Sequence, residues 1–438
     1  MTKALSGLLF ALAMLAGATA AAGITPKRMV LDNGIILLTS EQRALPMVSI
    51  ELLIDAGARL DGAGQEGLAN LAARLLTYGT QRRSALQISE ALDFIGASLS
   101  TGCGENLSTV SMTILKKDLS TGLALLAEVL TQSTFPQEEI DRQKQSIVGL
   151  LKAREEDPGD IAERRFAAAL FPKSPYGRPV EGTESSIRAI SQKSLREFYE
   201  RYYRPNRTIL AVVGDVSAEE IADALDQGLR SWKKGMPRDK LPAPSPSGAP
   251  ATIRVDKDLT QANIIMGHDG VTRDHPDYYA IQVMNNILGG GGFSSRLMDS
   301  IRNERGLAYS VYSFFSADKS HGTFQVGMQT KNDSAREAMR IARQEMERIR
   351  RAPVSEQELN DAKAYLTGSF PLRLDTNRKV ANFLALVEFF ELGLDYPERY
   401  GELIRKVTGE DVLRVAKRHV RPEQLVTVIV GDQKEIGD

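Results

Sequence analysis

The 438-residue chain has one cysteine, four histidines and almost no net charge. Because Cys103 stands alone, neither an intrachain disulfide nor a zinc cluster built on cysteines can form. No histidine precedes residue 268, so a metal site that needs several histidines is excluded from the first half of the chain. The four histidines are His268, His275, His321 and His419.

The charges are closely balanced, with 55 basic and 56 acidic residues. This balance produces no field that would recruit nucleic acid or an anionic membrane, so neither is expected as a partner. With 42% hydrophobic and 25% charged residues, the composition is that of a globular protein of two or three domains. Beyond the N-terminus there is no apolar run of about 18 residues, so we expect no membrane insertion.

Residues 1–20 place Lys3 ahead of an apolar run and end on the small-residue triplet Ala18-Thr19-Ala20. This order is typical of a secretory signal peptide with its cleavage site, although a buried N-terminal helix is the alternative. No cysteine follows the run, so a lipid anchor is not expected. We therefore expect an exported chain, whose destination in a Gram-negative cell would be the periplasm.

A proline-rich segment divides the rest of the chain into two parts that resemble each other. Residues 233–250 contain five prolines, which disfavour both helix and sheet, so we expect a linker between domains at 21–232 and 251–438. An Arg-Pro pair followed by an apolar run and Gly-Asp occurs near the end of each domain, at residues 204–215 and 421–432. The prolines are 217 residues apart (422 − 205). A duplicated folding unit explains this repeat.

The hydrophobic period alternates between strand and helix in both domains. We therefore expect an α+β fold of two homologous domains of about 200 residues, each with mixed or antiparallel sheets covered by helices. The expected strands are 29–40, 48–55, 107–115, 262–267, 308–316 and 323–330; the expected helices are 67–78, 84–96, 118–131, 276–288 and one beginning at Asp333.

Residues 67–80, GLANLAARLLTYGT, resemble the zinc-binding helix of the pitrilysin and insulin-degrading-enzyme family of metallopeptidases. In active members this segment reads G-L-A-H-x-x-E-H-x-x-x-x-G-T, where two histidines bind zinc and the glutamate is the general base. The strands before the helix, the duplication, the linker and the ending also resemble this family. The resemblance implies a clam-shell pairing of the chain with a partner chain.

The zinc chemistry of that family is missing from this segment. Asn70 and Arg74 stand where the two histidines belong, and Ala73 stands where the glutamate belongs. An amide oxygen is a weak zinc ligand and a guanidinium repels the metal. Active members supply a further glutamate ligand downstream, but residues 145–152, QSIVGLLK, contain no carboxylate. The resemblance therefore implies a chain with no catalytic residue, no metal and no independent activity.

The second domain keeps a different feature of the family. Arg302 and Tyr309, within RNERGLAY, resemble an arginine and tyrosine pair that contacts the substrate peptide opposite the zinc. Arg302 could donate a charge-assisted fork to a carbonyl or carboxylate, and Tyr309 could add a hydroxyl and an apolar face. The resemblance implies substrate binding, whereas the residues alone also allow a surface ion pair and ordinary packing.

Four consecutive glycines, Gly289, Gly290, Gly291 and Gly292, lie just upstream of this pair. Glycine is costly in a helix, so we expect a mobile or tightly turned loop. No Gly-Lys-Ser/Thr follows, which excludes a phosphate-binding P-loop. The loop is similar in position to the glycine-rich segment of noncatalytic subunits of mitochondrial processing peptidase, and a hinge without substrate contact is the alternative.

Two hypotheses follow from the resemblance. In the first, the chain is the noncatalytic, substrate-binding subunit of an exported metallopeptidase heterodimer that degrades unfolded peptides or oligopeptides. A homologous partner subunit would then carry the zinc and the base. In the second, the chain is a nonenzymatic peptide-holding or assembly protein of the same fold. An independent peptidase with another site is not supported, because nothing in the sequence supplies ligands.

Overall fold

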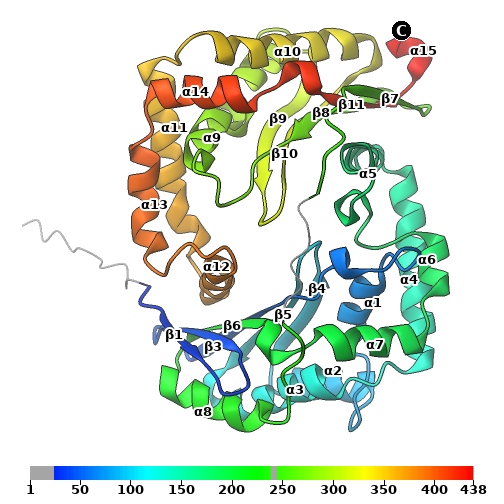
Figure 1. The fold of residues 1–438 in the computed structure, drawn as a ribbon, viewed down its shortest axis with the longest axis vertical. Coiled ribbons are helices and arrows are strands. Elements are labelled where there is room, and N and C mark those ends of the chain that lie inside the picture. Colours follow the sequence, from blue (N-terminus) through cyan, green and yellow to red (C-terminus); the bar gives the residue numbers. More distant parts are fainter. Residues whose placement is uncertain (1–23, 238–243, 438) are drawn as a thin grey trace, which may run out of the picture.

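The computed structural model describes residues 24–237 and 244–437 and builds one sheet from each half of the chain (Figure 1). The expected signal peptide and part of the expected linker lie outside these residues. The strands are β1 (Lys27–Val30), β2 (Ile36–Glu41), β3 (Met47–Ile54), β4 (Ser98–Cys103), β5 (Ser108–Leu115) and β6 (Thr208–Gly214) in the first half, and β7 (Ala251–Asp256), β8 (Gln261–Asp269), β9 (Ala308–Ala317), β10 (Gly322–Lys331) and β11 (Val426–Gly431) in the second.

Helices cover both sheets, and none among the described residues is long and apolar enough to cross a bilayer. In the first half they are α1 (Leu68–Leu75), α2 (Ala85–Phe94), α3 (Leu119–Gln132), α4 (Gln137–Glu156), α5 (Pro158–Leu170), α6 (Glu184–Ala189), α7 (Gln192–Tyr202) and α8 (Ala218–Leu229). In the second half they are α9 (Tyr278–Asn285), α10 (Ala335–Arg351), α11 (Glu356–Ser369), α12 (Asn377–Phe389), α13 (Tyr396–Arg405), α14 (Gly409–His419) and α15 (Gln433–Ile436).

The two sheets have the same strand order once β1 is set aside. The first runs β1-β2-β6-β3-β5-β4 and the second runs β7-β11-β8-β10-β9. In each sheet the strand of the duplicated ending, β6 or β11, pairs in parallel with one neighbour, β2 or β7. The pairs from this strand to the far edge, β4 or β9, are antiparallel. The expected α+β fold of two helix-covered sheets is confirmed.

One expected strand was wrong in its extent. Residues 29–40 were predicted as a single strand, but the structure has two antiparallel strands, β1 and β2, around a turn at Asn33 and Gly34. Gly34 has a φ of +91°, and its N–H donates to the carbonyl of Leu31. An Asn-Gly pair between apolar stretches is a turn signal, and here it overrides the continuous strand pattern.

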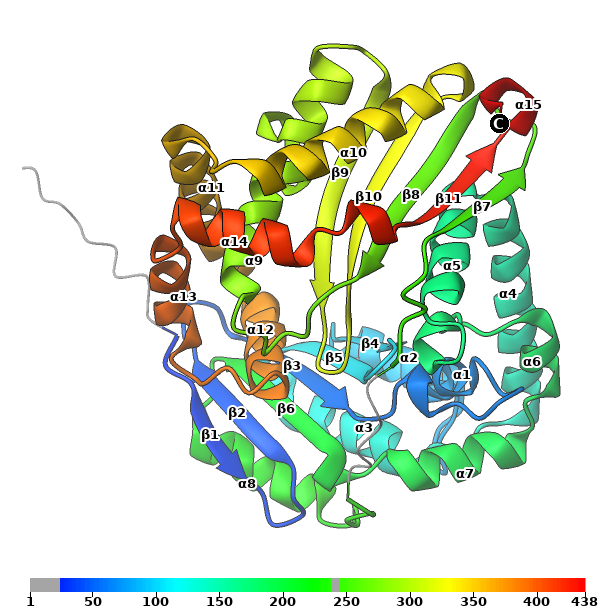
Figure 2. The same cartoon turned by 45° about the horizontal axis from the view of Figure 1, so that its top comes forward.

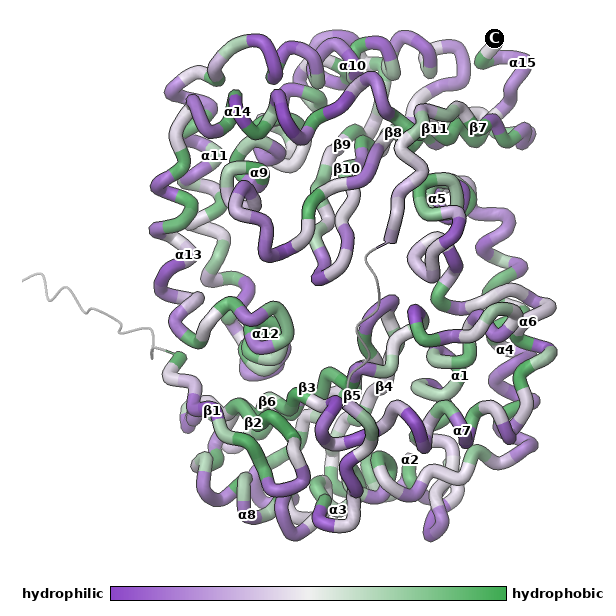
Figure 3. Tube along the Cα trace, viewed as in Figure 1, coloured by the Kyte–Doolittle hydropathy of each residue, from purple (hydrophilic) through white to green (hydrophobic). Residues whose placement is uncertain are grey.

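The two halves exchange one helix each. Helix α12 of the second half packs on the first sheet, where Leu384 and Ala385 meet Leu53 and Ala211. Helix α5 of the first half packs in the same way on the second sheet, against β8 and β11. Figure 2 shows both helices seated against the opposite half, and Figure 3 shows hydrophobic stretches along them. Apolar burial therefore ties the halves into one unit.

The exchanged helices leave part of each sheet uncovered on what we call its inner face, the face against which α12 or α5 packs. In the first sheet, Thr109 pairs with Leu53, which contacts α12, so both side chains lie on the inner face. In the second sheet, Gly327 pairs with Ile265 on one side and with Tyr312 on the other. Because Ile265 contacts α5, the side chain of Tyr312 also lies on the inner face. Strands β4 and β9 are the far edges of these faces.

Candidate functional site

Helix α1 begins at a glycine that the fold requires. Gly67 has a φ of +92°, and a Cβ there would lie 2.6 Å from the carbonyl oxygen of Glu181. The carboxylate of Asp61 accepts hydrogen bonds from the N–H groups of Gly67 at 2.8 Å and Ala69 at 2.9 Å. A carboxylate at this end of a helix satisfies free N–H groups and complements the helix dipole. The segment with the degenerate zinc motif therefore keeps a well-capped helix.

The motif positions carry donors without acceptors. Asn70 is 9% exposed, and its Nδ2 is buried without a hydrogen-bond partner among the described residues. Nη1 of Arg74 is buried and unpartnered in the same way, and the described residues offer its guanidinium no ion pair. Ala73 is fully buried and has no polar atom on its side chain. Zinc needs lone pairs, so these donors do not fit the metal of active relatives.

The segment that would supply the third ligand lies in α4, which packs along α1. Within residues 145–152, Ile147, Val148 and Leu151 are buried in the first-half core. The carboxylates of α4 lie at its two ends, at residues 138–141 and 155–156. Apolar packing therefore occupies the middle of the helix, and no ligand set for zinc is present there.

In the second half, Arg302 lies between two exposed rings. Its guanidinium carbon is 5.0 Å from the ring centre of Tyr309 and 4.8 Å from that of Phe293. Tyr309 is 75% exposed and Phe293 is 68% exposed. Among the described residues no carboxylate pairs with this guanidinium, so its charge is held only by the two rings. The structure thus brings the two predicted residues together and adds Phe293 to them.

A β-bulge places Tyr309 in this cluster. The pairing of β9 with β10 steps from Ser310↔Gln329 to Ala308↔Thr330, so Tyr309 is an extra residue in its strand. A bulge re-aims the side chain of the extra residue, and bulges are frequent beside functional sites. Here Ala308 keeps its place in the core while Tyr309 points to solvent beside Arg302.

The glycine-rich segment is not the loop that the sequence predicted. Gly289 and Gly290 belong to a π-helical turn, Asn286–Gly290, that continues α9, and only Gly291 and Gly292 leave the helix. A Cβ on Gly289 would lie 2.4 Å from Oγ of Ser313 on β9. Close packing of helix on strand therefore outweighs the low helix propensity of glycine. The glycine run is followed directly by Phe293. An aromatic residue in this position is the sequence signal that could have identified Phe293 as part of the site.

The inner face of β9 carries two further aromatic residues that the sequence did not single out. Tyr312 and Phe314 are partly exposed and stack with ring centres 6.2 Å apart and an interplanar angle of 19°. Gly327 on the neighbouring strand makes room for them, since its Cβ would lie 2.5 Å from the Tyr312 ring. Together with the Arg302 cluster they give β9 an aromatic surface.

Three potential metal ligands meet elsewhere in the second half. Ligand atoms of His275, Asp277 and His419 lie within 4.8 Å of one another. Asp277, however, already accepts hydrogen bonds from His419 at 2.7 Å and Arg414 at 2.6 Å. Although burial raises it, these hydrogen bonds hold the pKa of Asp277 below its ordinary value. The carboxylate is therefore neutralised by an ion-pair network, which disfavours a metal.

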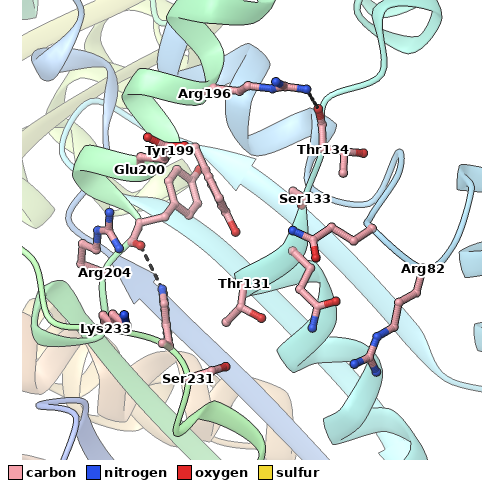
Figure 4. Close-up of a pocket in the computed structure, with 14 residues that line it drawn as sticks. Arg82, Thr131, Ser133, Thr134, Arg196, Tyr199, Glu200, Arg204, Ser231 and Lys233 are labelled. Carbon is pink, nitrogen blue, oxygen red and sulfur yellow. Dashed lines mark hydrogen bonds between the residues drawn. The ribbon is translucent and has the colours of Figure 1, made fainter.

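A surface hollow of about 670 Å³ opens between α3, α7 and the segment after α8 (Figure 4). Arg196 donates to the carbonyl of Thr134 at 3.3 Å, and the indole N–H of Trp232 donates to the carbonyl of Tyr203 at 3.0 Å. None of these described lining residues has a buried polar atom without a partner. The hollow lies in the helical layer outside the first sheet, away from α12, and nothing in it indicates chemistry.

Two family models match most of the chain. Residues 37–184 match the family described as Insulinase (Peptidase family M16), and residues 189–366 match the Peptidase M16 inactive domain. An uncharacterized zinc protease of Streptomyces coelicolor is 27% identical over 90% of this chain and 87% of its own length. One of Mycobacterium bovis is 28% identical over 94% of both.

Solved structures match almost the whole chain. The crystal structure of a peptidase M16 inactive domain from Pseudomonas fluorescens has a TM-score of 0.89 and is 27% identical, covering 94% of this chain and 99% of that one. A protease from Helicobacter pylori shares the fold, with a TM-score of 0.84, 19% identity and coverage of 93% and 99%. With its two matching domains and this shared architecture, the chain belongs to peptidase family M16.

Proposed function

We propose that the chain is the noncatalytic, substrate-binding subunit of an exported zinc metallopeptidase heterodimer. The observation that carries the proposal is the Arg302 guanidinium, which lies unpaired between Phe293 and Tyr309 while α1 offers donors in place of zinc ligands. A cation without an acidic partner, held at the surface by two rings, is suited to bind a carbonyl or carboxylate. The zinc and the general base would come from a homologous partner subunit in the periplasm.

The division of labour has a physical reason. Residues that position a peptide accelerate a reaction only when a reactive centre faces the bound substrate, and this chain supplies no such centre. The aromatic surface of β9 supports an unfolded peptide as the substrate, because Tyr312 and Phe314 offer apolar contact without shape specificity. Degradation of unfolded peptides or oligopeptides is the reaction that we assign to the pair of chains.

The test is peptidase activity of the mature chain alone and mixed with a zinc-motif homologue from the same organism. We expect activity only in the mixture, with about one zinc per pair of chains. In the complex, Arg302→Ala should lower kcat/KM by about 10–100-fold, because a charge-assisted hydrogen bond is lost, and Tyr309→Phe by about fivefold. The matched controls, Arg340→Ala and Tyr365→Phe, change exposed residues of the same half and should leave kcat/KM unchanged.

Unchanged kinetics in both site variants would refute the role of the pair. Inactivity of the mixture would favour the second hypothesis, a peptide-holding or assembly protein. The aromatic inner face of β9 is compatible with that role too, since apolar contact with an unfolded chain does not require its cleavage. Protection of an unfolded protein from aggregation by the chain alone is the measurement that would support it.

A further inference from the structure

A pocket of about 480 Å³ lies where the N-terminal end of α12 meets the inner face of the first sheet. Figure 2 shows α12 over this face. Residues 42–49 of the first half form one wall, and residues 374–380 of the second half form the other. Pockets that hold small molecules have volumes of about 300–1,000 Å³. The pocket is therefore large enough for a ligand, and a ligand in it would contact both halves of the chain.

Most of the surface of this pocket is apolar. The apolar side chains that line it are Ile24, Ala44, Leu45, Met47, Leu374 and Val380. Leu45 lies on the loop between β2 and β3 and is 58% exposed, so the pocket is open to solvent on this side. Covering an apolar concave surface with an apolar ligand is favourable. The pocket thus offers both an entrance and an apolar wall.

The polar groups of the pocket include a hydroxyl and a guanidinium that are free to bind a ligand. Ser49 is 3% exposed, yet its hydroxyl has no hydrogen bond to any described residue. Arg378, in the first turn of α12, forms no salt bridge and donates no hydrogen bond within the described part of the chain. Asp375, the other charged residue of the lining, is paired with Lys379 at 2.9 Å. The pocket therefore has one unpaired positive charge.

Glu51 is the acidic group that faces Arg378 from the sheet. It lies two residues along β3 from Ser49 and within electrostatic reach of Arg378, but the two groups form no salt bridge. The carboxylate of Glu51 accepts a hydrogen bond from Ser111 at 2.5 Å. Burial raises the pKa of Glu51, although this hydrogen bond and Arg378 oppose the rise. The N–H donors of the guanidinium are therefore left for another acceptor.

We propose that this pocket binds a small amphiphilic carboxylate, a molecule with one apolar chain or ring and one carboxylate group. The apolar part lies against Leu45, Met47 and Leu374. The carboxylate accepts hydrogen bonds from Arg378 and Ser49, beside the favourable dipole of the N-terminal turn of α12.

A free acid fits this pocket better than a peptide does. Strands β3 and β5 are interior strands of the first sheet, so their backbone groups are already paired with neighbouring strands. A peptide backbone would find no free strand edge there. The site lies entirely within this chain and stands apart from the proposed function.

The probes are octanoate, its neutral analogue octanamide, and acetate, each titrated into the mature chain by calorimetry. We expect saturable binding of octanoate. Octanamide should bind at least about tenfold more weakly because it lacks the charged acceptor, and acetate at least about 100-fold more weakly because it lacks the apolar chain. Displacement of octanoate by an equal concentration of the tripeptide Ala-Ala-Leu would overturn the assignment to a free acid.

Variants of the chain locate the site. Arg378→Gln should weaken binding of octanoate at least about tenfold and leave the affinity for octanamide unchanged, because only the charge is removed. Ser49→Ala should weaken octanoate binding several-fold, and Leu45→Ser about fivefold. The matched controls, Arg340→Gln and Leu86→Ser, change an exposed arginine and an exposed leucine on other helices and should have no effect.

A structural readout tests whether the ligand contacts both halves. Octanoate should slow amide exchange in β3 and in the first turn of α12 together. It should also raise the Tm of the unmodified chain and of Arg340→Gln, but not of Arg378→Gln, because a ligand stabilises only the state that binds it.

Three results would overturn the proposal: equal affinities for octanoate and octanamide, an unchanged affinity for octanoate in Arg378→Gln, or no saturable binding of octanoate. Each of these is measured without a partner subunit and without peptide cleavage. A failure of the heterodimer experiment therefore leaves this site untouched, and a failure here leaves the role of Arg302 and Tyr309 untouched.

Discussion

The two halves of the chain share a strand order but present opposite chemistry on their inner faces. On β5 the uncovered residues are Thr109, Ser111 and Thr113, whereas on β9 they are Tyr312 and Phe314. The faces that turn toward the core are apolar in both sheets. Burial thus accounts for the apolar residues that the two sheets share, while the uncovered parts of their inner faces differ in chemistry.

The halves also differ in how they depart from a regular helix. In the first half, α1 ends at Leu75, and its unusual feature is a pair of unpaired donors. In the second half, the corresponding α9 runs on through a π-helical turn to Gly290, which brings the chain toward Phe293 and Arg302. The first half therefore has buried donors at the motif positions of α1, and the second half has a structured cluster that reaches solvent.

The largest effect should come from breaking the helix exchange. Phe166 on α5 and Leu384 on α12 are fully buried against the opposite sheet. Phe166→Ala should lower the free energy of unfolding by about 3–5 kcal/mol, and Leu384→Ala by about 2–5 kcal/mol, because each leaves a cavity. Leu86→Ala, on the exposed side of α2, is the control and should change it by less than about 0.5 kcal/mol.

Hydrogen exchange distinguishes the exchanged helices from ordinary core packing. Phe166→Ala changes the first half of the sequence, yet it should speed amide exchange in β8 and β11 of the second sheet. Leu384→Ala should do the reverse and speed exchange in β3 and β6. Faster exchange confined to the half that carries the substitution would contradict the reciprocal packing.

Asp61 should make the first half less stable as the pH rises. Burial raises its pKa to about 7 in the folded chain, above the value of about 4 in the unfolded chain. Between these values the folded chain keeps a proton that the unfolded chain has lost. The contribution of Asp61 to the free energy of unfolding therefore falls by as much as about 4 kcal/mol from pH 4 to pH 7. Urea unfolding across this range checks it: the free energy of unfolding of the unmodified chain minus that of Asp61→Asn should fall by this amount, and an equal slope in both would contradict the assignment.

His268 should act in the opposite direction in the second half. Its side chain is buried, accepts a hydrogen bond from the N–H of Arg421 at 3.0 Å, and burial lowers its pKa to about 4. Between pH 6.5 and pH 4 the unfolded chain gains a proton that the folded chain does not. The contribution of His268 to the free energy of unfolding therefore falls by about 3 kcal/mol as the pH drops through this window, opposite to that of Asp61. His268→Gln keeps an acceptor and removes this opposing contribution, so the free energy of unfolding of the variant should change more steeply between pH 4 and pH 6.5 than that of the unmodified chain; an unchanged slope would refute it.

The sequence predicted the fold well because the two halves repeat the same apolar periods, and burial enforces those periods. It also predicted where the Arg302 and Tyr309 pair lies, since the motif residues are adjacent in sequence to the elements that hold them. The helix exchange was not predictable, because α5 and α12 have ordinary apolar faces that do not reveal which sheet they cover. The motif residues give the order of helices and strands along the chain, whereas tertiary packing decides which helix covers which sheet.

Two parts of the site could not be predicted for related reasons. Glycine propensity argued for a loop at Gly289, but contact with Ser313 on β9 favours a helix there, and that contact is long-range. The bulge at Tyr309 depends on its register with β10, which the residues of β9 alone do not specify. In both cases the deciding interaction comes from a strand that is distant in sequence.

The smallest effect should come from removing the aromatic side chains of the inner face of β9. Tyr312→Ser and Phe314→Ser each remove aromatic contact area, so each should weaken binding of a fluorescently labelled unfolded peptide by about 1 kcal/mol, or about fivefold, in an anisotropy titration. Thr113→Ser, on the inner face of β5, should have no measurable effect. Equal losses on both faces would mean that the peptide contacts both sheets. A loss confined to β9 means that the peptide is held from one side, which leaves its other side open to a reactive centre on a partner chain.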